Sequence, residues 1–394
     1  MTRIGFAYNQ KPEPNVGLVS GSAESHTADE EPPSISDVYA EWDSAETIDA
    51  VASALSAYGE VIRLEATQDF PERLRDARPD IVFNIAEGLH GTNREAHVPG
   101  ICEFFDIPYS GSDPFTLSLC LHKAKTKDFL TAHGIANAKY ALVESNAELE
   151  RLLRSHDLFA GRPSSTAPLF VKPVQEGSSK GITERNFVRS RDELVAQTRF
   201  LLETYDQPVL VEEFLPGAEF TCGVLGNDTS ARVLPLVGMN FASLPAGAVP
   251  IYGFEAKWVW DTPADPIDIF ECPAQIDDAL TAAISDVVLR AYRVLGCRDW
   301  SRVDVRLDAA GVPNIVEVNP LPGILPNPED NSCLPKAARA AGLDYDELIQ
   351  AALLAAAERH GLSLQRDSEW RMASRELAAP GIATRSSQFA IRAV

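Results

Sequence analysis

Hydrophobic and polar residues alternate between two kinds of pattern along the N-terminal third of the chain. Apolar runs between polar loops predict three strands, at 3–8, 61–64 and 80–84. Apolar residues at helical spacing predict helices between them, at 44–58 and 71–77, and a further helix that ends near 105. This order is typical of a parallel sheet with helices on both faces. We therefore expect an α/β, doubly wound domain over 1–113, with an acidic mobile loop at 10–43.

The pattern continues with longer helices and with strands that end in charged residues. Helical spacing predicts three helices, at 117–133, 276–295 and 345–359. Apolar runs predict strands at 168–173 and 209–214, and another strand that starts at Glu219. Three lysines in the first of these helices, Lys123, Lys125 and Lys127, indicate either a solvated helix face or an anion site. No clear period remains after 362, so residues 363–394 are expected to form a loose tail.

One predicted hairpin carries an unusual set of polar residues. Two alternating runs, 303–307 and 315–318, flank the turn-forming sequence Asp-Ala-Ala-Gly. Successive strand side chains point to opposite faces, so Glu317 and Asn319 share a face and Asp304 can join them from the neighbouring strand. Two carboxylates and an amide oxygen are suited to a nucleotide-bound Mg²⁺. By themselves, the same residues are more typical of an ordinary hairpin with solvated acids than of a metal site.

Composition narrows the class of protein. The chain has 394 residues, and its hydrophobic content of 45% is sufficient for more than one domain with its own core. A formal net charge of -22 argues against nucleic acid or an anionic membrane as the main partner. The six cysteines show no CxxC pair, the N-terminus has no signal-peptide pattern, and no apolar stretch is long enough to span a membrane. These features are typical of a cytoplasmic protein.

Two further stretches carry groups suited to a nucleotide. Lys172 lies at the end of a predicted strand and precedes QEGSSKGI, whose backbone N–H groups and hydroxyls are suited to phosphate oxygens. This loop matches neither the P-loop nor the dinucleotide-binding pattern. Glu212 and Glu213 end another strand, where they are suited to accept hydrogen bonds from amino or hydroxyl groups. Each stretch alone is also typical of an ordinary surface loop, so their order along the chain is the more specific signal.

A succession of motifs extends from about residue 80 to residue 360: VFNIAEG, REAHVPG, IPYSGS, HKAKTK, KPVQEGSSKGI, VLVEEFLPGAEFTCGV, EAKW, CRDWSRVDVRLD, IVEVNPLPG and LPKAARAAG. In this order they resemble the ATP-grasp ligases, and among them the D-alanine–D-alanine ligases and their close relatives. The resemblance implies an ATP-grasp fold, in which the N-terminal doubly wound domain precedes two α+β subdomains that enclose the nucleotide. These subdomains would be a central lid at 114–211 and a C-terminal part at 212–362 that carries the hairpin.

The resemblance also implies roles for individual residues. ATP would be bound by lysines, by the Gly/Ser loop and by acids beside the adenine and the ribose: Lys123, Lys172, Glu176, Ser178, Ser179, Glu212, Glu213, Glu219 and Lys257. Two Mg²⁺ or Mn²⁺ ions would be held by Asp304, Glu317 and Asn319. Arg302 and the backbone N–H of Gly323 would stabilise an oxyanion, and Ser178 and Lys257 would belong to the same catalytic set.

These parts imply an ATP-dependent ligase that forms an amide bond between small amino acids. The γ-phosphoryl group would be transferred to a carboxylate, and an amine would attack the resulting acyl phosphate. The first candidate pair is D-alanine with D-alanine, as in peptidoglycan biosynthesis, and the family resemblance suggests a homodimer. Two alternatives stay open: the same chemistry on other amino acids or on a specialised metabolite, and a nucleotide-binding regulatory protein without turnover.

The sequence departs from the family where the amino-acid substrates would bind. The Gly-Gly-x-Ser-x-Glu type loop after the first strand is absent, and Trp258 replaces the usual Tyr, although indole cannot accept a hydrogen bond. Glu87 replaces the usual His, and it is either an acceptor for a substrate ammonium or a solvated turn acid. Ser332 matches a serine that binds the second substrate's carboxylate. The ATP half is thus expected to be preserved and the amino-acid half altered.

Overall fold

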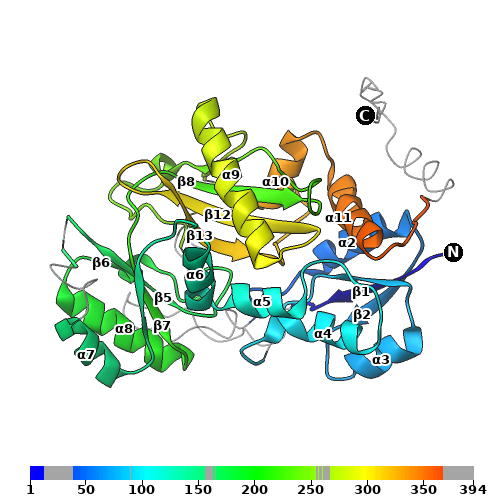
Figure 1. Ribbon diagram of the computed structural model, residues 1–394, viewed down its shortest axis with the longest axis horizontal. Helices are drawn as coiled ribbons and strands as arrows, with labels where there is room; N and C mark the ends of the chain where they lie inside the picture. The colour runs from blue at the N-terminus through cyan, green and yellow to red at the C-terminus, as the bar shows by residue number, and fades with distance from the viewer. Residues whose placement is uncertain are drawn as a thin grey trace, which may run out of the picture.

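The computed structural model describes most of the chain, namely residues 1–12, 39–88, 90–155, 163–164, 166–253, 256, 260 and 267–366. Nearly all of the expected tail and most of the expected loop at 10–43 lie outside these residues. The described chain forms three sheets, and those of the N-terminal and central parts lie at opposite ends of the molecule, with the largest sheet between and above them (Figure 1). The predicted segment boundaries at 113, 211 and 362 stay a prediction, and the second of them falls within a strand.

The N-terminal sheet is parallel, which confirms the doubly wound arrangement. Its strands, in the order β2-β1-β3, are β1 (Arg3–Tyr8), β2 (Glu60–Glu65) and β3 (Ile81–Asn84). The associated helices are α2 (Ala45–Ser56), α3 (Phe70–Ala77) and α4 (His97–Phe104), with the 3-10 turn η1 (Arg94–Ala96) before α4. Ser44 caps α2 by accepting from Thr47 N at 3.2 Å. Because the strands are parallel, β1 and β3 direct the residues that follow them to the same edge of the sheet.

The predicted helix at 117–133 is wrong, because the chain forms two helices there, α5 (Pro114–Leu121) and α6 (Lys123–Ala132). His122 separates them with a non-helical ψ of 89°, and its ring accepts from Lys125 N. The break lets Lys123 N donate to Val174 O at 3.0 Å, across to another part of the fold. As a result the lysines diverge: Lys123 and Lys127 are buried and Lys125 is exposed.

The central sheet is antiparallel, in the order β4-β7-β5-β6. Its strands are β4 (Tyr140–Val143), β5 (Leu169–Pro173), β6 (Phe187–Val188) and β7 (Val209–Glu213). The helices α7 (Asn146–Ser155) and α8 (Arg191–Tyr205) and the 3-10 turn η3 (Glu184–Asn186) accompany it. Leucines and valines of both layers, among them Leu149, Val171 and Leu194, form a separate core cluster. This sheet therefore has a core of its own and presents its other face to the cavity described below.

The largest sheet carries the predicted hairpin. Its order is β11-β10-β8-β12-β13, with β9 paired to β8, and its strands are β8 (Glu219–Leu225), β9 (Arg232–Val233), β10 (Val237–Met239), β11 (Phe270–Glu271), β12 (Trp300–Leu307) and β13 (Pro313–Asn319). The helices are α9 (Asp278–Leu295), α10 (Cys333–Ala340) and α11 (Tyr345–Arg359), with the 3-10 turn η4 (Phe241–Ser243). α9 covers one face of the sheet, and α11 lies beside α2 of the N-terminal part (Figure 1). A hydrophobic core shared by α2 and α11 joins the two ends of the chain.

Candidate active site

The hairpin of β12 and β13 brings the predicted metal ligands together. Asp304 lies directly opposite Glu317, and Arg302 lies opposite Asn319. Asp304 Oδ2 accepts from Arg302 Nη2 at 3.2 Å and from Asn319 Nδ2 at 3.3 Å. Its other oxygen accepts from Thr221 Oγ1, on β8, at 2.9 Å. These side chains converge because alternate residues of a strand share a face.

The donor set of the hairpin fits Mg²⁺. Asp304 and Glu317 supply carboxylate oxygens and Asn319 supplies an amide oxygen, which are the ligands that a hard cation prefers. Among the described residues, no group of three or more His, Cys, Asp or Glu side chains forms a metal cluster. A small ligand set of this kind leaves coordination positions for phosphate oxygens, as Mg²⁺ in nucleotide sites usually has.

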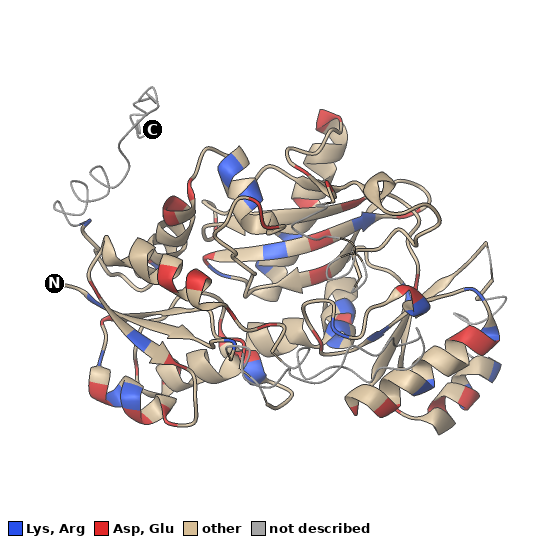
Figure 2. Cartoon of the chain, turned by 180° about the vertical axis from the view of Figure 1, so that it is seen from behind, with Lys and Arg blue, Asp and Glu red and all other residues tan. Residues whose placement is uncertain are grey.

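Buried lysines from two layers face the hairpin. Lys172 at the end of β5 and Lys127 on α6 each lie 2.8 Å from an oxygen of Glu212. Lys123 Nζ lies 2.7 Å from Glu317 Oε1, so it links α6 to the hairpin. Burial raises the pKa of Glu212, but the two lysines outweigh burial and hold that pKa at about 2. Figure 2 shows both signs of charge along the strands of the largest sheet, in keeping with this dense pairing.

The Gly/Ser loop at 176–181 is tied to the N-terminal domain. Gly177 N donates to Glu41 Oε1 at 2.8 Å, and a Cβ at this glycine would lie 2.5 Å from the same oxygen. Lys180 Nζ lies 3.8 Å from Glu41 Oε2 and 2.7 Å from the carboxylate of Glu176. Ser178 and Ser179 adopt positive φ angles of 49° and 63°, a conformation that non-glycine residues rarely hold without support. The loop therefore depends on contacts from outside its own segment.

A further ion pair lies on the side of the cavity formed by β8 and β12. Arg306 Nη1 donates to Glu219 Oε2 at 2.7 Å, and its guanidinium lies 4.4 Å from the centroid of the Phe214 ring. Burial raises the pKa of Glu219, although Arg306 opposes the shift. Glu213, at the end of β7, lines the same region. Carboxylates and an aromatic ring thus lie together at the edge between the two antiparallel sheets.

Carboxylates crowd the end of the cavity nearest the N-terminal sheet. Glu41 is paired, because both its oxygens accept from Arg94 Nη2, at 2.8 and 3.1 Å. Glu87 and Glu95 have no hydrogen-bond or ion-pair partner within the described part of the chain, and Glu95 is only 9% exposed. Burial raises the pKa of Glu95 to about 7, with Arg94 opposing the shift and Glu41 adding to it. Burial also raises the pKa of Glu87, and Glu95 raises it further. Burial thus favours the neutral form of these two acids, and a nearby cation would favour their ionised form.

The segment after β13 supplies the remaining predicted groups. Ser332 is buried, and its hydroxyl lies 3.4 Å from the carbonyl oxygen of Gly323 and 3.2 Å from Leu325 N. Cys333 follows at the start of α10 and also lines the cavity. This wall therefore combines a hydroxyl group with a weakly polar thiol.

All of these groups surround one cavity of about 380 Å³. It is lined by every predicted site residue that the structure describes, namely Glu87, Lys123, Lys172, Glu176, Ser178, Ser179, Glu212, Glu213, Glu219, Arg302, Asp304, Glu317, Asn319, Gly323 and Ser332. Lys257 and Trp258 lie outside the described residues. The structure thus places the described candidates in one site, and their individual roles stay a prediction.

Several cavity residues were not predicted from the sequence. They include the charged residues Lys11, Glu41, Asp43, Glu95 and Arg306. Lys127, one helical turn after Lys123, was named only as part of a possible anion site. Arg306 carried a usable signal, because it lies two positions after Asp304 on the same strand face. Glu41 and Glu95 had no such local signal, because their position depends on how distant loops meet.

Comparison with known proteins agrees with this site. Residues 129–354 match the family described as "D-ala D-ala ligase C-terminus". The chain is 34% identical over 269 residues to D-alanine–D-alanine ligase of Bordetella petrii, covering 68% of this chain and 73% of that protein. It is 30% identical over 320 residues to the same enzyme of Pelotomaculum thermopropionicum, covering 81% of this chain and 93% of that protein.

No helix in the described ranges is long and apolar enough to cross a membrane.

The fold agrees as well. The crystal structure of D-alanine–D-alanine ligase from Bacillus anthracis complexed with ATP is similar to the chain, with a TM-score of 0.60 and 23% identity over 91% of this chain and all of that one. The family match covers more than half of the chain, and the parallel N-terminal sheet followed by two antiparallel sheets is the arrangement expected of an ATP-grasp protein. The chain therefore belongs to the D-alanine–D-alanine ligase family and is an ATP-dependent ligase that forms a C–N bond.

Proposed function

We propose that this enzyme joins the carboxylate of one small amino acid to the amine of another through an acyl phosphate. The observation that carries the proposal is one cavity lined together by a hairpin with two carboxylates and an arginine, by buried lysines, and by two acids that have no partner among the described residues. The lysines suit a polyphosphate, and the acids suit ammonium groups. D-Alanine with D-alanine is the first pair to test.

The chain's own residues would prepare the phosphoryl transfer. Lys123 and Lys172 would bind phosphate oxygens, and Glu212, whose two oxygens contact Lys127 and Lys172, would hold these lysines in place. Mg²⁺, bound by the hairpin ligands described above, would supply charge neutralisation and alignment of the phosphates. A carboxylate oxygen would bond to the γ-phosphorus while the bond to ADP breaks, which gives the acyl phosphate.

Amide formation would follow in the same cavity. The substrate amine, once deprotonated, would attack the acyl carbon, and Arg302 with the backbone N–H of Gly323 would stabilise the negative oxygen. The carbon–oxygen bond to phosphate would then break, leaving the amide and inorganic phosphate. Water must be excluded until this step is complete, and the loop at 176–181, tied to Glu41, is suited to cover the intermediate.

The substrates are less defined than the chemistry. Glu87 and Glu95 are unpaired acids at the N-terminal end of the cavity, so we propose that they face the ammonium of the first amino acid. Ser332 lines the same cavity, and we propose that it contacts the carboxylate of the second amino acid. The crowding of acids also favours a second candidate, the same reaction on amino acids other than D-alanine. A non-catalytic nucleotide-binding protein has less support, because such a protein needs no arginine beside the metal ligands.

The test is a substrate panel with Mg²⁺ and ATP. Phosphate release and product mass would be measured with each amino acid alone and in pairs, in both D and L forms. Release with D-alanine alone, together with the mass of the dipeptide, supports the first pair. Release with a different pair supports the second candidate. Absence of release across the whole panel would contradict the proposed function.

Two finer expectations accompany the proposal. We infer a homodimer, supported by two aromatic side chains that stand exposed on neighbouring helices, Phe104 (84% exposed) on α4 and Phe115 (66%) on α5. We also infer that the enzyme acts in the cytoplasm, which is supported by its six free cysteines. Sedimentation of the wild type against Phe104→Ser tests the first expectation, and cell fractionation tests the second.

A further inference from the structure

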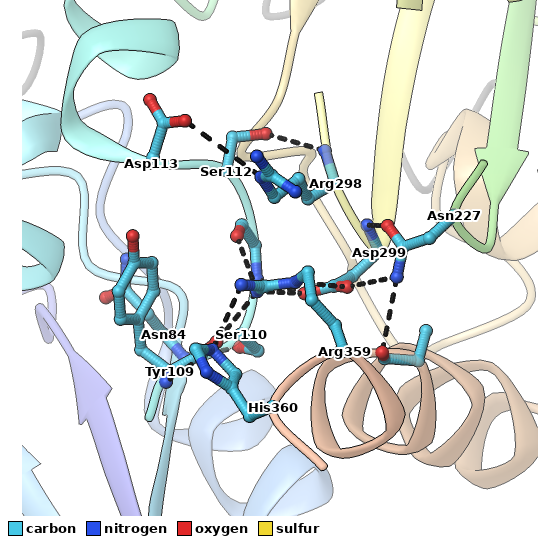
Figure 3. Close-up of polar contacts among 12 residues, drawn as sticks. Asn84, Tyr109, Ser110, Ser112, Asp113, Asn227, Arg298, Asp299, Arg359 and His360 are labelled. Atoms are coloured by element: carbon cyan, nitrogen blue, oxygen red, sulfur yellow. Dashed lines mark hydrogen bonds and ion pairs between the residues drawn. The ribbon is translucent and has the colours of Figure 1, made fainter. Parts of the chain in front are cut away.

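A buried aspartate outside the cavity joins the site's central strand to the N-terminal domain (Figure 3). Asp299 directly precedes β12, is fully buried and has a φ of 65°. Its Oδ2 accepts from Gly111 N at 2.8 Å and from Arg359 Nη2 at 2.9 Å. Its Oδ1 accepts from Asn227 Nδ2 at 2.7 Å, and Asn227 Oδ1 in turn accepts from Asp299 N at 2.8 Å. A carboxylate with this many partners stays fixed in one orientation.

The arginine partner extends the same contact to a loop of the N-terminal domain. Arg359, the last residue of α11, donates through Nη2 to the carbonyl oxygens of Tyr109 at 2.9 Å and Gly111 at 3.2 Å. His360 Nε2 lies 3.1 Å from the same Tyr109 oxygen. Figure 3 shows Arg359 and Asp299 pointing toward each other between α11 and the loop. Because guanidinium is planar and donates in fixed directions, it sets the distance between these groups.

The loop leads from this ion pair to the substrate end of the cavity. Ser110 Oγ accepts from Asn84 N at 3.0 Å, at the end of β3. Asn84 Oδ1 accepts from Ala86 N at 3.1 Å, and the next residue is Glu87. Ser110, Asn84 and Ala86 are all buried. The position of the Glu87 turn is therefore connected to Asp299 through short, directional contacts.

In the other direction, Asp299 sets the start of the strand that carries the catalytic chemistry. Trp300 follows it, is fully buried and packs against Phe83 of β3 with the ring centroids 5.4 Å apart. Arg302 and Asp304 lie two and four positions further along the same strand. A displacement of Asp299 would therefore be passed along β12 to both residues.

The two domains do not depend on this ion pair for their attachment. Apolar residues of α11 and α2, such as Leu353 and Val51, share one core, and Gln350 Nε2 donates to Ala54 O at 3.0 Å. Hydrophobic contacts hold surfaces together without specifying direction, whereas buried hydrogen bonds and ion pairs specify geometry. The apolar contacts therefore hold the interface together, and the Asp299–Arg359 pair fixes the relative position of the two surfaces.

We propose that Asp299 and Arg359 are positioning residues, which set the distance between the acid-substrate end at Glu87 and the reacting end at Arg302 and Asp304. The inference rests on the proposed function of these three residues. Phosphoryl transfer requires the substrate carboxylate to lie in line with the γ-phosphate, and a displacement of about 1 Å can cost on the order of 100-fold in rate. ATP binding involves the lysines and β7, so it is not affected.

A displaced acyl phosphate also becomes accessible to water. Attack by water breaks the bond between the acyl group and phosphate and returns the free carboxylate, so phosphate appears without amide. In the correctly positioned enzyme one phosphate is released for each amide bond. The ratio of phosphate to amide therefore measures positioning, and a general loss of stability does not change it.

The experiment compares Arg359→Lys, Arg359→Met and Asp299→Asn with the matched control Gln350→Met, which removes a buried contact between the same helix and the N-terminal domain. Thermal unfolding gives the folded fraction, and kcat, KM for ATP and the phosphate-to-amide ratio are then measured. We expect kcat to fall about 10- to 100-fold in Arg359→Met and Asp299→Asn, with a ratio above one and KM for ATP within about twofold of wild type. Arg359→Lys retains the positive charge and the fold but loses the planar guanidinium that donates in several fixed directions. Its kcat and its phosphate-to-amide ratio should therefore be intermediate.

Three results would overturn the inference. If Arg359→Lys and the other folded variants keep the wild-type ratio and kcat, or if Gln350→Met shows the same uncoupling, the ion pair is only structural. If Arg359→Met and Asp299→Asn fail to fold, Arg359→Lys alone decides between these outcomes. A wild type that releases no phosphate with any substrate pair overturns the proposed function, and this inference with it.

Discussion

The two ends of the cavity differ in whether their charged side chains are paired. At the end proposed to bind the phosphates, called the phosphate end, lysines and arginines are already paired with acids, as in Lys172 with Glu212 and Lys123 with Glu317. At the substrate end, Glu87 and Glu95 have no such partner among the described residues. Paired charges keep long side chains in place before the nucleotide arrives, whereas unpaired acids increase the attraction for an incoming cation. If these assignments hold, the nucleotide end is organised in advance, whereas the substrate end would be completed by its ligand.

Replacing the hairpin carboxylates should produce the largest effect at the phosphate end. Asp304→Asn and Glu317→Gln keep the side-chain shapes but remove the charges that suit Mg²⁺. Partners of metal ligands are typically worth about 10–100-fold, so losing a direct ligand should reduce turnover by more than about 100-fold. Phosphate release under saturating ATP is the measurement. Asp308→Asn is the control, because among the described residues the donors to the Asp308 carboxylate are two backbone N–H groups of its own turn. Unchanged turnover in both site variants would remove the metal assignment.

The arginine of the hairpin should have the next largest effect. Arg302→Met leaves both carboxylates in place and removes the group proposed to stabilise the oxyanion, so kcat should fall about 10²–10³-fold. Nucleotide affinity, measured by equilibrium binding of ATP, should change much less. Arg298→Met serves as the control, since Arg298 lies just before the same strand but is largely exposed. Equal losses in kcat and nucleotide affinity would show that Arg302 organises the phosphate end generally.

The residues of the phosphate end were also the ones that could be predicted from the sequence. Alternation along one strand was sufficient to place Asp304, Glu317 and Asn319 on one face, because strand periodicity is a local property. The strand at Arg3–Tyr8 and the helix at Tyr345–Arg359 were predicted at the residues where the structure has them, for the same reason. The fold class followed from the order of these elements.

The parts that escaped prediction depend on contacts between distant segments. The helix breaks at His122, where Lys123 N donates to Val174 O on a distant segment, and no local pattern indicates this contact. Glu41 reaches the site by contacting Gly177, far along the chain, and Glu95 is unpaired only because of what surrounds it in three dimensions. Such positions follow from tertiary packing, which overrides local propensity.

Glu41 connects the two ends, and its replacement should have a moderate effect. Glu41→Gln removes the charge that holds Arg94 and weakens the acceptor for Gly177 N. Hydrogen bonds to charged groups are worth about 1.5–3 kcal/mol, so KM for ATP should rise about tenfold. Hydrogen exchange of the 176–181 amides should become faster at the same time. Glu46→Gln, an exposed acid on α2, is the control. Unchanged exchange in that loop would show that Glu41 does not hold it.

The smallest expected effect concerns pH at the substrate end. Burial raises the pKa of Glu95 to about 7, so the side chain is mainly neutral below this pH and ionised above it. If Glu95 faces the substrate ammonium, KM for the first amino acid should fall several-fold as pH rises from 6 to 8. Glu95→Gln should lose this dependence and keep a high KM throughout.

The folding stability should also depend on Glu95, but it should decrease as pH rises, whereas substrate binding improves. The pKa of Glu95 is higher in the folded state than in the unfolded chain, so the folded state binds more protons between the ordinary carboxyl pKa and about 7, and stability falls as pH rises through that window. Glu95→Gln removes this penalty and should raise the Tm above pH 7 by about 2–4 °C for each kcal/mol recovered. Thermal unfolding at pH 5 and pH 8 tests the sign. A Glu95→Gln variant that is less stable than wild type at pH 8 would mean that the carboxylate is already paired, and that the substrate end is organised in advance like the phosphate end.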